Sequence, residues 1–242
     1  MCIRDSNLPL NNWDVSNVEN MREMFQRSDF NQPIDQWDVS NVENMREMFR
    51  SANSFNQDIS NWNTSSLTDI REMFFGAVAF NNGLPAGVSS TTMNWDISKV
   101  NSLNNVFNDA LAFNGNINGW DVSNVTQAIN TFDTATNFNQ PLDNWDVTSI
   151  SRMENMFNEA SLFDQDISCW CVSHDPLRTG FSDSSPINSK SNFLPRWAQP
   201  CSPILTMDDS LSLAGDDTLI GPGESITFTA SFDRDIASTV SY

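Results

Sequence analysis

Residues 120–144 read WDVSNVTQAINTFDTATNFNQPLDN, and Trp145 begins the same pattern again. Seven tryptophans, separated by 24, 25, 33, 25, 25 and 25 residues, recur along the chain: Trp13, Trp37, Trp62, Trp95, Trp120, Trp145 and Trp170. A fixed period in this range is typical of a solenoid, in which similar units stack and only the stack has a core. The functional question is therefore which ligand a long, regular surface binds.

Other residue types recur at fixed positions, counted here from the tryptophan that opens each unit. Phenylalanine lies at +12 in six units, and a second phenylalanine lies at +18 from the second unit on. Aspartate follows the tryptophan at +1 in five of these six units, and an aliphatic residue lies at +5 in all six. The third unit carries eight extra residues around 83–87, which predict a loop pushed out of one coil.

The spacing of the apolar positions predicts the local structure. Positions +5, +8 and +12, such as Val42, Met45 and Phe49, recur at helical intervals and predict one short helix per unit over +5 to +13. The apolar residues of 117–122 have the spacing of a short strand whose alternate residues point inward. We therefore expect an α/β repeat over residues 7–169: a leucine-rich-repeat-like, right-handed solenoid of six full coils, with short parallel strands and one short helix per coil.

Composition limits the class of partner. Lys and Arg total 12 against 31 Asp and Glu, which gives a net charge of −19 and a pI near 4.1. Nucleic acid and anionic membrane surfaces would repel such a chain, so we expect neither as a partner. No apolar run has the length that spans a bilayer, so we expect no direct membrane insertion.

Three motifs carry a resemblance to a known family. WDVSNV (120–125), FNQPL (138–142) and MENMF (153–157) resemble the repeat of BspA-like leucine-rich-repeat surface proteins of bacteria. The resemblance covers roughly residues 7–201 and implies secretion or surface display, an adhesion-type role and no catalytic residue. Units three to five depart from its methionine positions, which predicts looser packing there. The departing residues are Ile70, Leu103, Val106, Ala128 and Thr131.

The segment 170–203 resembles the closing cap of such arrays. In those caps a cysteine after the last repeat tryptophan pairs with one after a final tryptophan, which implies a disulfide between Cys171 and Cys201. Cys169 is left over. Two alternatives remain: all four cysteines are free, or Cys169, Cys171, Cys201 and His174 form a metal site, although their spacing is unlike that of common zinc sites.

Both ends of the chain differ from the repeats. Residues 1–6, MCIRDS, resemble a translated sequencing adapter, so we interpret them as an artefact on a fragment whose upstream coils are missing. Residues 204–242 alternate apolar and polar residues around a turn at 221–223, which predicts β-strands. This segment resembles the opening strands of a bacterial immunoglobulin-like module, cut before the sandwich is complete.

Residues that could carry chemistry are few. The chain has one histidine, His174, and shows no Ser/His/Asp set and no phosphate-binding loop, so we expect no enzyme, no cofactor and no metal. The +1 aspartates form a column that either fixes the turn after each tryptophan or, as the alternative, binds calcium or a basic partner. A second column, of asparagines, is expected to bridge coils through buried side-chain amides. Its members are Asn31, Asn56, Asn81, Asn114 and Asn139.

These observations favour a non-enzymatic binding or adhesion module, secreted or on the bacterial cell surface, that recognises an extracellular protein or polysaccharide. The alternatives are a structural spacer in a larger surface protein and an accessory module of a polysaccharide-directed enzyme. The insertion at 83–94 is the candidate recognition loop, with Ser89, Thr91 and Thr92 as polar contacts, because it alone breaks the repeat. An ordinary tolerated insertion is the simpler explanation and is favoured over a recognition loop. The oligomeric state is not specified by the sequence.

Overall fold

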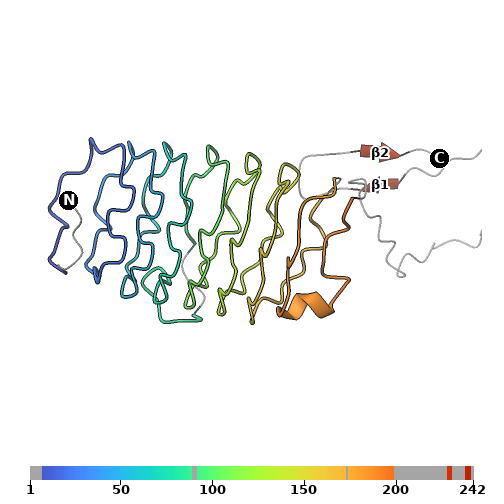
Figure 1. The fold of residues 1–242 in the computed structure, drawn as a ribbon. Coiled ribbons are helices and arrows are strands. Elements are labelled where there is room, and N and C mark those ends of the chain that lie inside the picture. The colour runs from blue at the N-terminus through green and yellow to red at the C-terminus, as the bar shows by residue number, and fades with distance from the viewer. Residues whose placement is uncertain (1–6, 89–91, 173, 199–227, 231–237, 241–242) are drawn as a thin grey trace, which may run out of the picture. The chain divides into compact units, whose positions relative to one another are not determined.

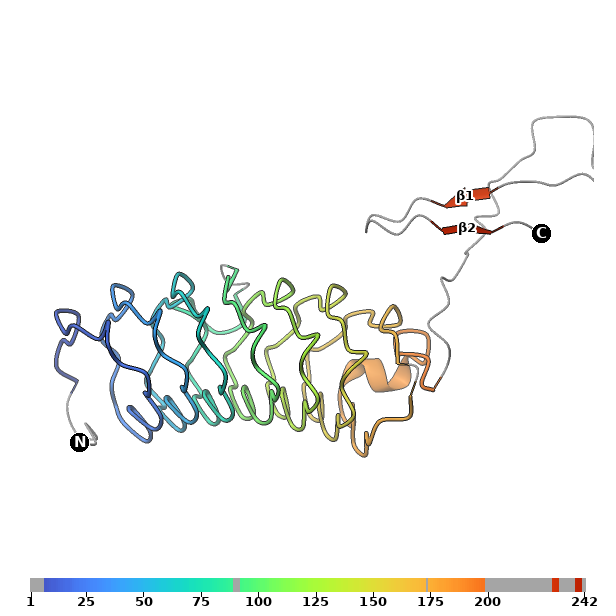
Figure 2. The same cartoon turned by 90° about the horizontal axis from the view of Figure 1, so that it is seen from above.

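The computed structural model describes residues 7–88, 92–172 and 174–198, together with the two short strands β1, Phe228–Ala230, and β2, Ser238–Val240. The chain divides into two compact units, Met1–Cys201 and Ser202–Tyr242, which are described separately. In the first unit the chain winds into successive coils that lie side by side along one axis, as both views show (Figures 1 and 2). A coil is named below by the tryptophan that opens it, from the first at Trp13 to the seventh at Trp170.

A ladder of backbone hydrogen bonds joins each coil to the next. The amides at +8, +10, +12 and +14 donate to the carbonyls at +7, +9, +11 and +13 of the following coil, at N···O distances from 2.6 to 3.1 Å. Between the first two coils, for example, the amide of Phe25 donates to the Met48 carbonyl at 2.9 Å. Because every second amide is used in this way, the segment from +7 to +14 behaves like a parallel β-ladder.

The predicted helix over +5 to +13 is wrong for the residues that the structure describes. This segment is a succession of turns, and its residues at +10 and +14 have left-handed backbone conformations, such as Glu47 at φ 58° and Thr134 at φ 59°. A right-handed helix needs negative φ throughout and would use the same amides within the coil. The apolar residues still face inward, because the turns return Met45 and Phe49 to the interior.

The predicted strand at Trp-x-Val is also displaced. The parallel bridges between coils fall mostly at +7, as in the pairs Asn20–Asn44, Asn44–Asp69 and Gln127–Arg152. At Trp-x-Val the coils are joined by side chains: the indole N–H of Trp62 donates to the Ile34 carbonyl at 3.1 Å. The right-handed, leucine-rich-repeat-like class stays a prediction.

The core consists of aromatic columns that run along the solenoid. In the second to sixth coils the +12 and +18 phenylalanines stack, with ring centroids 3.8 Å apart for Phe49 and Phe55. The +12 ring also stacks on that of the next coil, at 5.7 Å from Phe49 to Phe74. The repeat tryptophans from Trp37 to Trp170 are at most 4% exposed, whereas Trp13 is 49% exposed. Stacked aromatic rings of this kind are expected to supply much of the stability.

The insertion in the third coil already includes Leu84, which the spacing places at the apolar +22 position of the repeat. Leu84 is only half-buried, and Met93 takes the core position that Ile59 and Ile117 hold in their coils, at 1% exposure. The Met93 carbonyl accepts the indole N–H of Trp120 at 3.0 Å, as the Ile117 carbonyl accepts that of Trp145. The residues added to the coil therefore lie between Asn81 and Met93.

The repeat geometry continues past residue 169, where the six predicted coils end. The amide of Phe157 donates to the Phe181 carbonyl at 2.7 Å, so residues 177–183 extend the ladder into a seventh coil. The 3-10 helix η1, Pro186–Ser189, follows it and buries Ile187. Phe181 packs edge-on against both Phe157 and Trp197, at centroid distances of 5.4 and 5.0 Å. These contacts cover the last stacked ring.

Cys171 is disulfide-bonded, but its predicted partner Cys201 lies outside the described residues, so the pairing stays a prediction. The Cys169 thiol lies 3.8 Å from the Asp143 carbonyl oxygen. In the second unit β1 and β2 pair antiparallel, with Phe228 opposite Val240. The immunoglobulin-like class predicted for residues 204–242 rests otherwise on undescribed residues and stays a prediction. Residues 1–6 also lie outside the described part.

Candidate functional site

The +1 aspartates are used inside their own coils. The Asp96 carboxylate accepts hydrogen bonds from the Ser98 amide at 3.0 Å and from the Ser98 hydroxyl at 2.6 Å. The bond from the Ser98 hydroxyl has the larger effect and the bond from its amide the smaller, and together they hold the pKa of Asp96 below its ordinary value. The same bond to the amide two residues on recurs at Asp14, Asp38, Asp121 and Asp146. The column therefore fixes the turn after each tryptophan, as the simpler of the two hypotheses predicted.

The asparagine column bridges coils as predicted, although only Asn81 and Asn114 of its members are buried. The side-chain oxygen of Asn31 accepts the Asn56 amide at 2.9 Å, and that of Asn56 accepts the Asn81 amide at 2.8 Å. The ladder continues from Asn81 to Asn114 and from Asn114 to Asn139, again at 2.8 and 2.9 Å. Its side chains are committed to neighbouring coils, so they are not a free binding face.

Paired charges follow the +9 and +10 positions of the first three coils. The Glu47 carboxylate, whose side chain is 8% exposed, lies 3.0 Å from the Arg46 guanidinium and 3.2 Å from that of Arg50. Arg50 also reaches Glu72 at 2.6 Å. In the later coils asparagines replace these charges, and the Asn130 amide donates to Asn105 at 2.9 Å. The ion pairs of the first three coils and the asparagine hydrogen bonds of the later coils both hold the left-handed +10 residue of one coil against the next coil.

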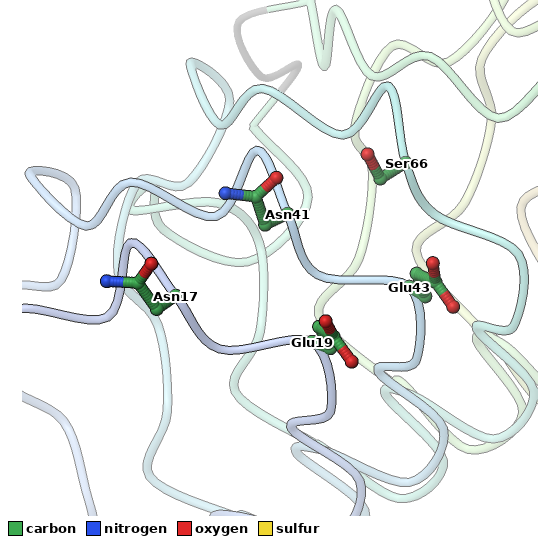
Figure 3. A pocket seen from close by; sticks show the side chains of 5 residues that line it. All are labelled: Asn17, Glu19, Asn41, Glu43 and Ser66. Atoms are coloured by element: carbon green, nitrogen blue, oxygen red, sulfur yellow. The ribbon is translucent and has the colours of Figure 1, made fainter.

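A polar groove crosses the first three coils beside the ladder, and Figure 3 shows its lining. It has a volume of about 290 Å³ and is lined by Asn17, Glu19, Asn41, Glu43 and Ser66, which occupy the +4 and +6 positions. Asn17 and Asn41 lie on successive coils, and on each coil the glutamate lies two residues after the asparagine (Figure 3). We call this feature the polar groove.

The main chain fixes the spacing of the groove residues. The Glu19 carbonyl accepts the Glu43 amide at 2.8 Å, and the Glu43 carbonyl accepts the Thr68 amide at 2.8 Å. The Asn41 side-chain amide donates to the Ser16 carbonyl at 2.8 Å. Successive positions therefore lie about 4.8 Å apart, the separation of paired strands. The groove offers a ligand a preset array of amide, carboxylate and hydroxyl groups.

The groove carboxylates differ from the other glutamates of these coils. Within the described residues, neither the Glu19 nor the Glu43 carboxylate has a hydrogen bond or an ion pair, whereas Glu23, Glu47 and Glu72 are all paired with arginines. Both side chains are exposed. Two carboxylates one coil apart repel each other by roughly 1 kcal/mol even in bulk water. A positive group between them would remove this repulsion.

The predicted recognition loop is placed only in part. Ser89 and Thr91 lie outside the described residues, while Thr92 is exposed and forms a parallel bridge with Asn116 of the next coil. The described part of the loop is tied down by coil asparagines: the Asn81 side chain donates to the Pro85 carbonyl at 2.6 Å, and that of Asn114 to the Gly87 carbonyl at 3.2 Å.

Aliphatic side chains gather beside this loop. Val78, Val88 and Leu111 are 37%, 46% and 38% exposed. Backbone bonds of Ala112 to Val78 and Gly87 place all three on neighbouring turns. They interrupt an otherwise polar surface, and sequence reasoning missed them because two lie in ordinary repeat positions.

The described residues hold no group of three or more His, Cys, Asp and Glu side chains that could bind a metal ion. The ring of His174 lies 2.7 Å from the Ile150 carbonyl oxygen, so the single histidine ties the seventh coil to the sixth. Among the described residues no helix is long and apolar enough to cross a bilayer.

Stacked, repeated coils define the molecule as a repeat protein, and sequence comparison agrees with this class. The profile of the family described as "Mycoplasma protein of unknown function, DUF285" matches the chain twice, at residues 2–92 and at 86–193. The chain belongs to this family. The two matches meet at the insertion in the third coil. No curated protein and no solved structure matches the chain.

Proposed function

We propose that the coils form a non-enzymatic binding module, secreted or displayed on a bacterial cell surface, that recognises an extracellular macromolecule. The observation that carries the proposal is the polar groove, whose unpaired carboxylates, amides and hydroxyl are held at fixed spacing by the ladder. A preorganised surface loses little conformational entropy on binding, which favours recognition of a large partner. The resemblance to BspA-like surface proteins supports the cellular location.

The net charge of −19 supports a protein or a neutral polysaccharide as the partner and disfavours polyanions. Two further features suit a binding surface: the exposed Val78, Val88 and Leu111, and the insertion that they flank. Exposed aliphatic side chains on a rigid scaffold commonly contribute to protein contacts. The alternative of a structural spacer is favoured by the repeat-invariant columns, whose aspartates and asparagines serve their own coils.

Binding of the purified chain to immobilised host-matrix proteins, to algal polysaccharides and to whole cells tests the proposal. We expect saturable binding to one of these partners, and loss of that binding after thermal unfolding of the chain. Absence of binding to all of them would favour the spacer.

A loop deletion locates the binding surface. Removal of residues 83–91 shortens the third step from 33 to 24 residues, the length of the first, and retains Met93 for the core. The substitution Thr92→Ala changes one exposed loop residue and serves as the milder variant. Weaker binding by either variant would assign recognition to the loop. Unchanged binding by both would show that Ser89, Thr91 and Thr92 are not the site.

A further inference from the structure

At three junctions between coils, a carbonyl at +3 accepts a hydrogen bond from a nitrogen donor at +4 of the next coil, next to the groove. The side-chain amide of Asn41 donates to the Ser16 carbonyl at 2.8 Å, and that of Asn124 donates to the Ser98 carbonyl at 2.8 Å. In the fourth coil the donor is the ammonium group of Lys99, 2.7 Å from the Ser65 carbonyl. The protein therefore already places one of its own cations in this column.

The first three coils have the acceptors for a cation but no cation in the column. Position +4 is Asn17, Asn41 and Ser66 there, and the carboxylates of Glu19 and Glu43 add two negative charges at +6. Four arginines of these coils pair with carboxylates outside the groove: Arg22 with Glu23, Arg46 and Arg50 with Glu47 and Glu72, and Arg71 with Asp69. The groove is thus a concave array of acceptors with unneutralised negative charge.

We propose that the polar groove binds a basic side chain, an ammonium or guanidinium group, of an extended segment in a partner protein. The inference rests on the proposed function, since it names the chemistry of the partner at the groove. The cation bridges the Glu19 and Glu43 carboxylates, and a further N–H group donates to the side-chain oxygen of Asn17 or Asn41. Both carboxylates then accept charge-assisted hydrogen bonds, the stronger kind.

The column also sets the limits of the site. At +6 the glutamates give way to Thr68, whose hydroxyl already donates to the Glu43 carbonyl at 3.0 Å. One coil further, Lys99 places a positive charge in the column. A second cation would be repelled there, so the site accepts a basic group over the first three coils only. A neutral glycan fits less well, because no aromatic side chain lines the groove for a sugar ring to stack on.

Calorimetric titration of the full 242-residue chain with two synthetic peptides, Gly-Lys-Gly-Lys-Gly and Gly-Arg-Gly-Arg-Gly, tests the inference. We expect measurable binding of at least one peptide, no binding of the acetyl-lysine form of the first, and an affinity that falls with added salt. The double variant Glu19→Gln/Glu43→Gln should weaken binding at least tenfold. Side-chain amide signals of Asn17 and Asn41 should shift in NMR spectra of the unsubstituted chain on peptide addition.

The matched control is Asp29→Asn/Asp35→Asn, which removes two exposed charges from the same coils outside the groove. It should change affinity less than threefold. Equal loss in both double variants, or full affinity in the groove variant, would overturn the inference, as would failure of both peptides to bind. Binding of the chain to matrix proteins without peptide binding would leave the proposed function standing. Peptide binding in the groove without any extracellular macromolecular partner would reject the proposed function alone.

Discussion

At the scale of single residues, the left-handed positions at +10 and +14 explain why the predicted helix does not form. Such a conformation costs a non-glycine residue roughly 1–2 kcal/mol, and glycine occupies it only at Gly76 and Gly180 in these columns. The first three coils hold glutamates such as Glu47 at +10, which are ordinary helix residues in a sequence pattern. The ladder imposes the conformation on them from outside the coil, and the only other local signal was the asparagine at +10 of the later coils, such as Asn130, a residue type that adopts this conformation more readily.

Asp109 occupies one of these +14 positions and is expected to destabilise the fold when ionised. Burial, followed by the charges of Asp133 and Glu159, raises the pKa of Asp109 above its ordinary value. Because the pKa is raised in the folded state, the stability that protonated Asp109 contributes is fully present at low pH. This stability is lost as the pH rises through that pKa. Asp109→Asn should therefore raise the unfolding midpoint at pH 7, and the gain should vanish below about pH 3, near the bottom of the ordinary carboxyl range.

Chemical denaturation at both pH values measures the effect of Asp109→Asn. Asp29→Asn removes an exposed charge elsewhere and controls for the reduction of net charge. Equal gains for the two variants at pH 7, or a gain for Asp109→Asn that persists at low pH, would contradict the local explanation.

At the scale of the element, the core columns follow from the sequence, but the backbone that carries them does not. The Trp and Phe periods predicted which residues are buried, and the asparagine column was predicted to bridge coils. These features depend on the identity of repeated side chains. The strand position and the polar groove depend on which backbone segments pair between coils. That pairing sets the spacing of the +4 and +6 residues of neighbouring coils through backbone hydrogen bonds at +6.

Phe132→Ala tests the stacked column. The ring lies 4.1 Å from that of Phe138 in its own coil, and 5.7 and 5.4 Å from those of Phe107 and Phe157 in the neighbouring coils. Because rings on three sides are held by their own coils, the cavity cannot collapse, and we expect a loss of about 3–5 kcal/mol in the free energy of unfolding. Urea denaturation measures it.

Phe75→Ala is the matched control for Phe132→Ala. Phe75 is half-buried and contacts the Arg50 guanidinium, 4.8 Å from its ring centroid. We expect a smaller loss from this substitution. Equal losses from the two variants would show that stacking along the axis adds nothing to ordinary burial.

At the scale of the whole molecule, the C-terminal closure has two parts: a seventh turn that continues the ladder, and aromatic packing of Phe181 against Trp197. Only the first tryptophan of this closure, Trp170, lay in register with the repeat, and the positions that follow it depart from the apolar pattern. The sequence pattern therefore ended the coils too early. The pairing of Cys171 with Cys201 came from resemblance alone.

Proteolytic mapping of secreted protein under non-reducing conditions tests this pairing. We expect a peptide that contains both Cys171 and Cys201 and that separates into two on reduction. Substitution Cys171→Ser should lower the free energy of unfolding by about 2–4 kcal/mol, as expected when a disulfide that closes a loop of this length is lost. Recovery of Cys171 and Cys201 as separately alkylated thiols would refute the pairing.

The asparagine ladder has a consequence for how the gene can change. Each Asn side chain bonds the amide of its own counterpart in the next coil, so every junction between coils is made of the same two groups. If recombination between repeats removed the 25 codons from Asn31 to Phe55, the amide of Asn56 would meet the side chain of Asn7, as that of Asn31 does now. Loss or gain of whole coils thus leaves this ladder intact, whereas loss of part of a coil breaks it. Crossing-over in register can therefore vary the length of the solenoid while each coil keeps its fold.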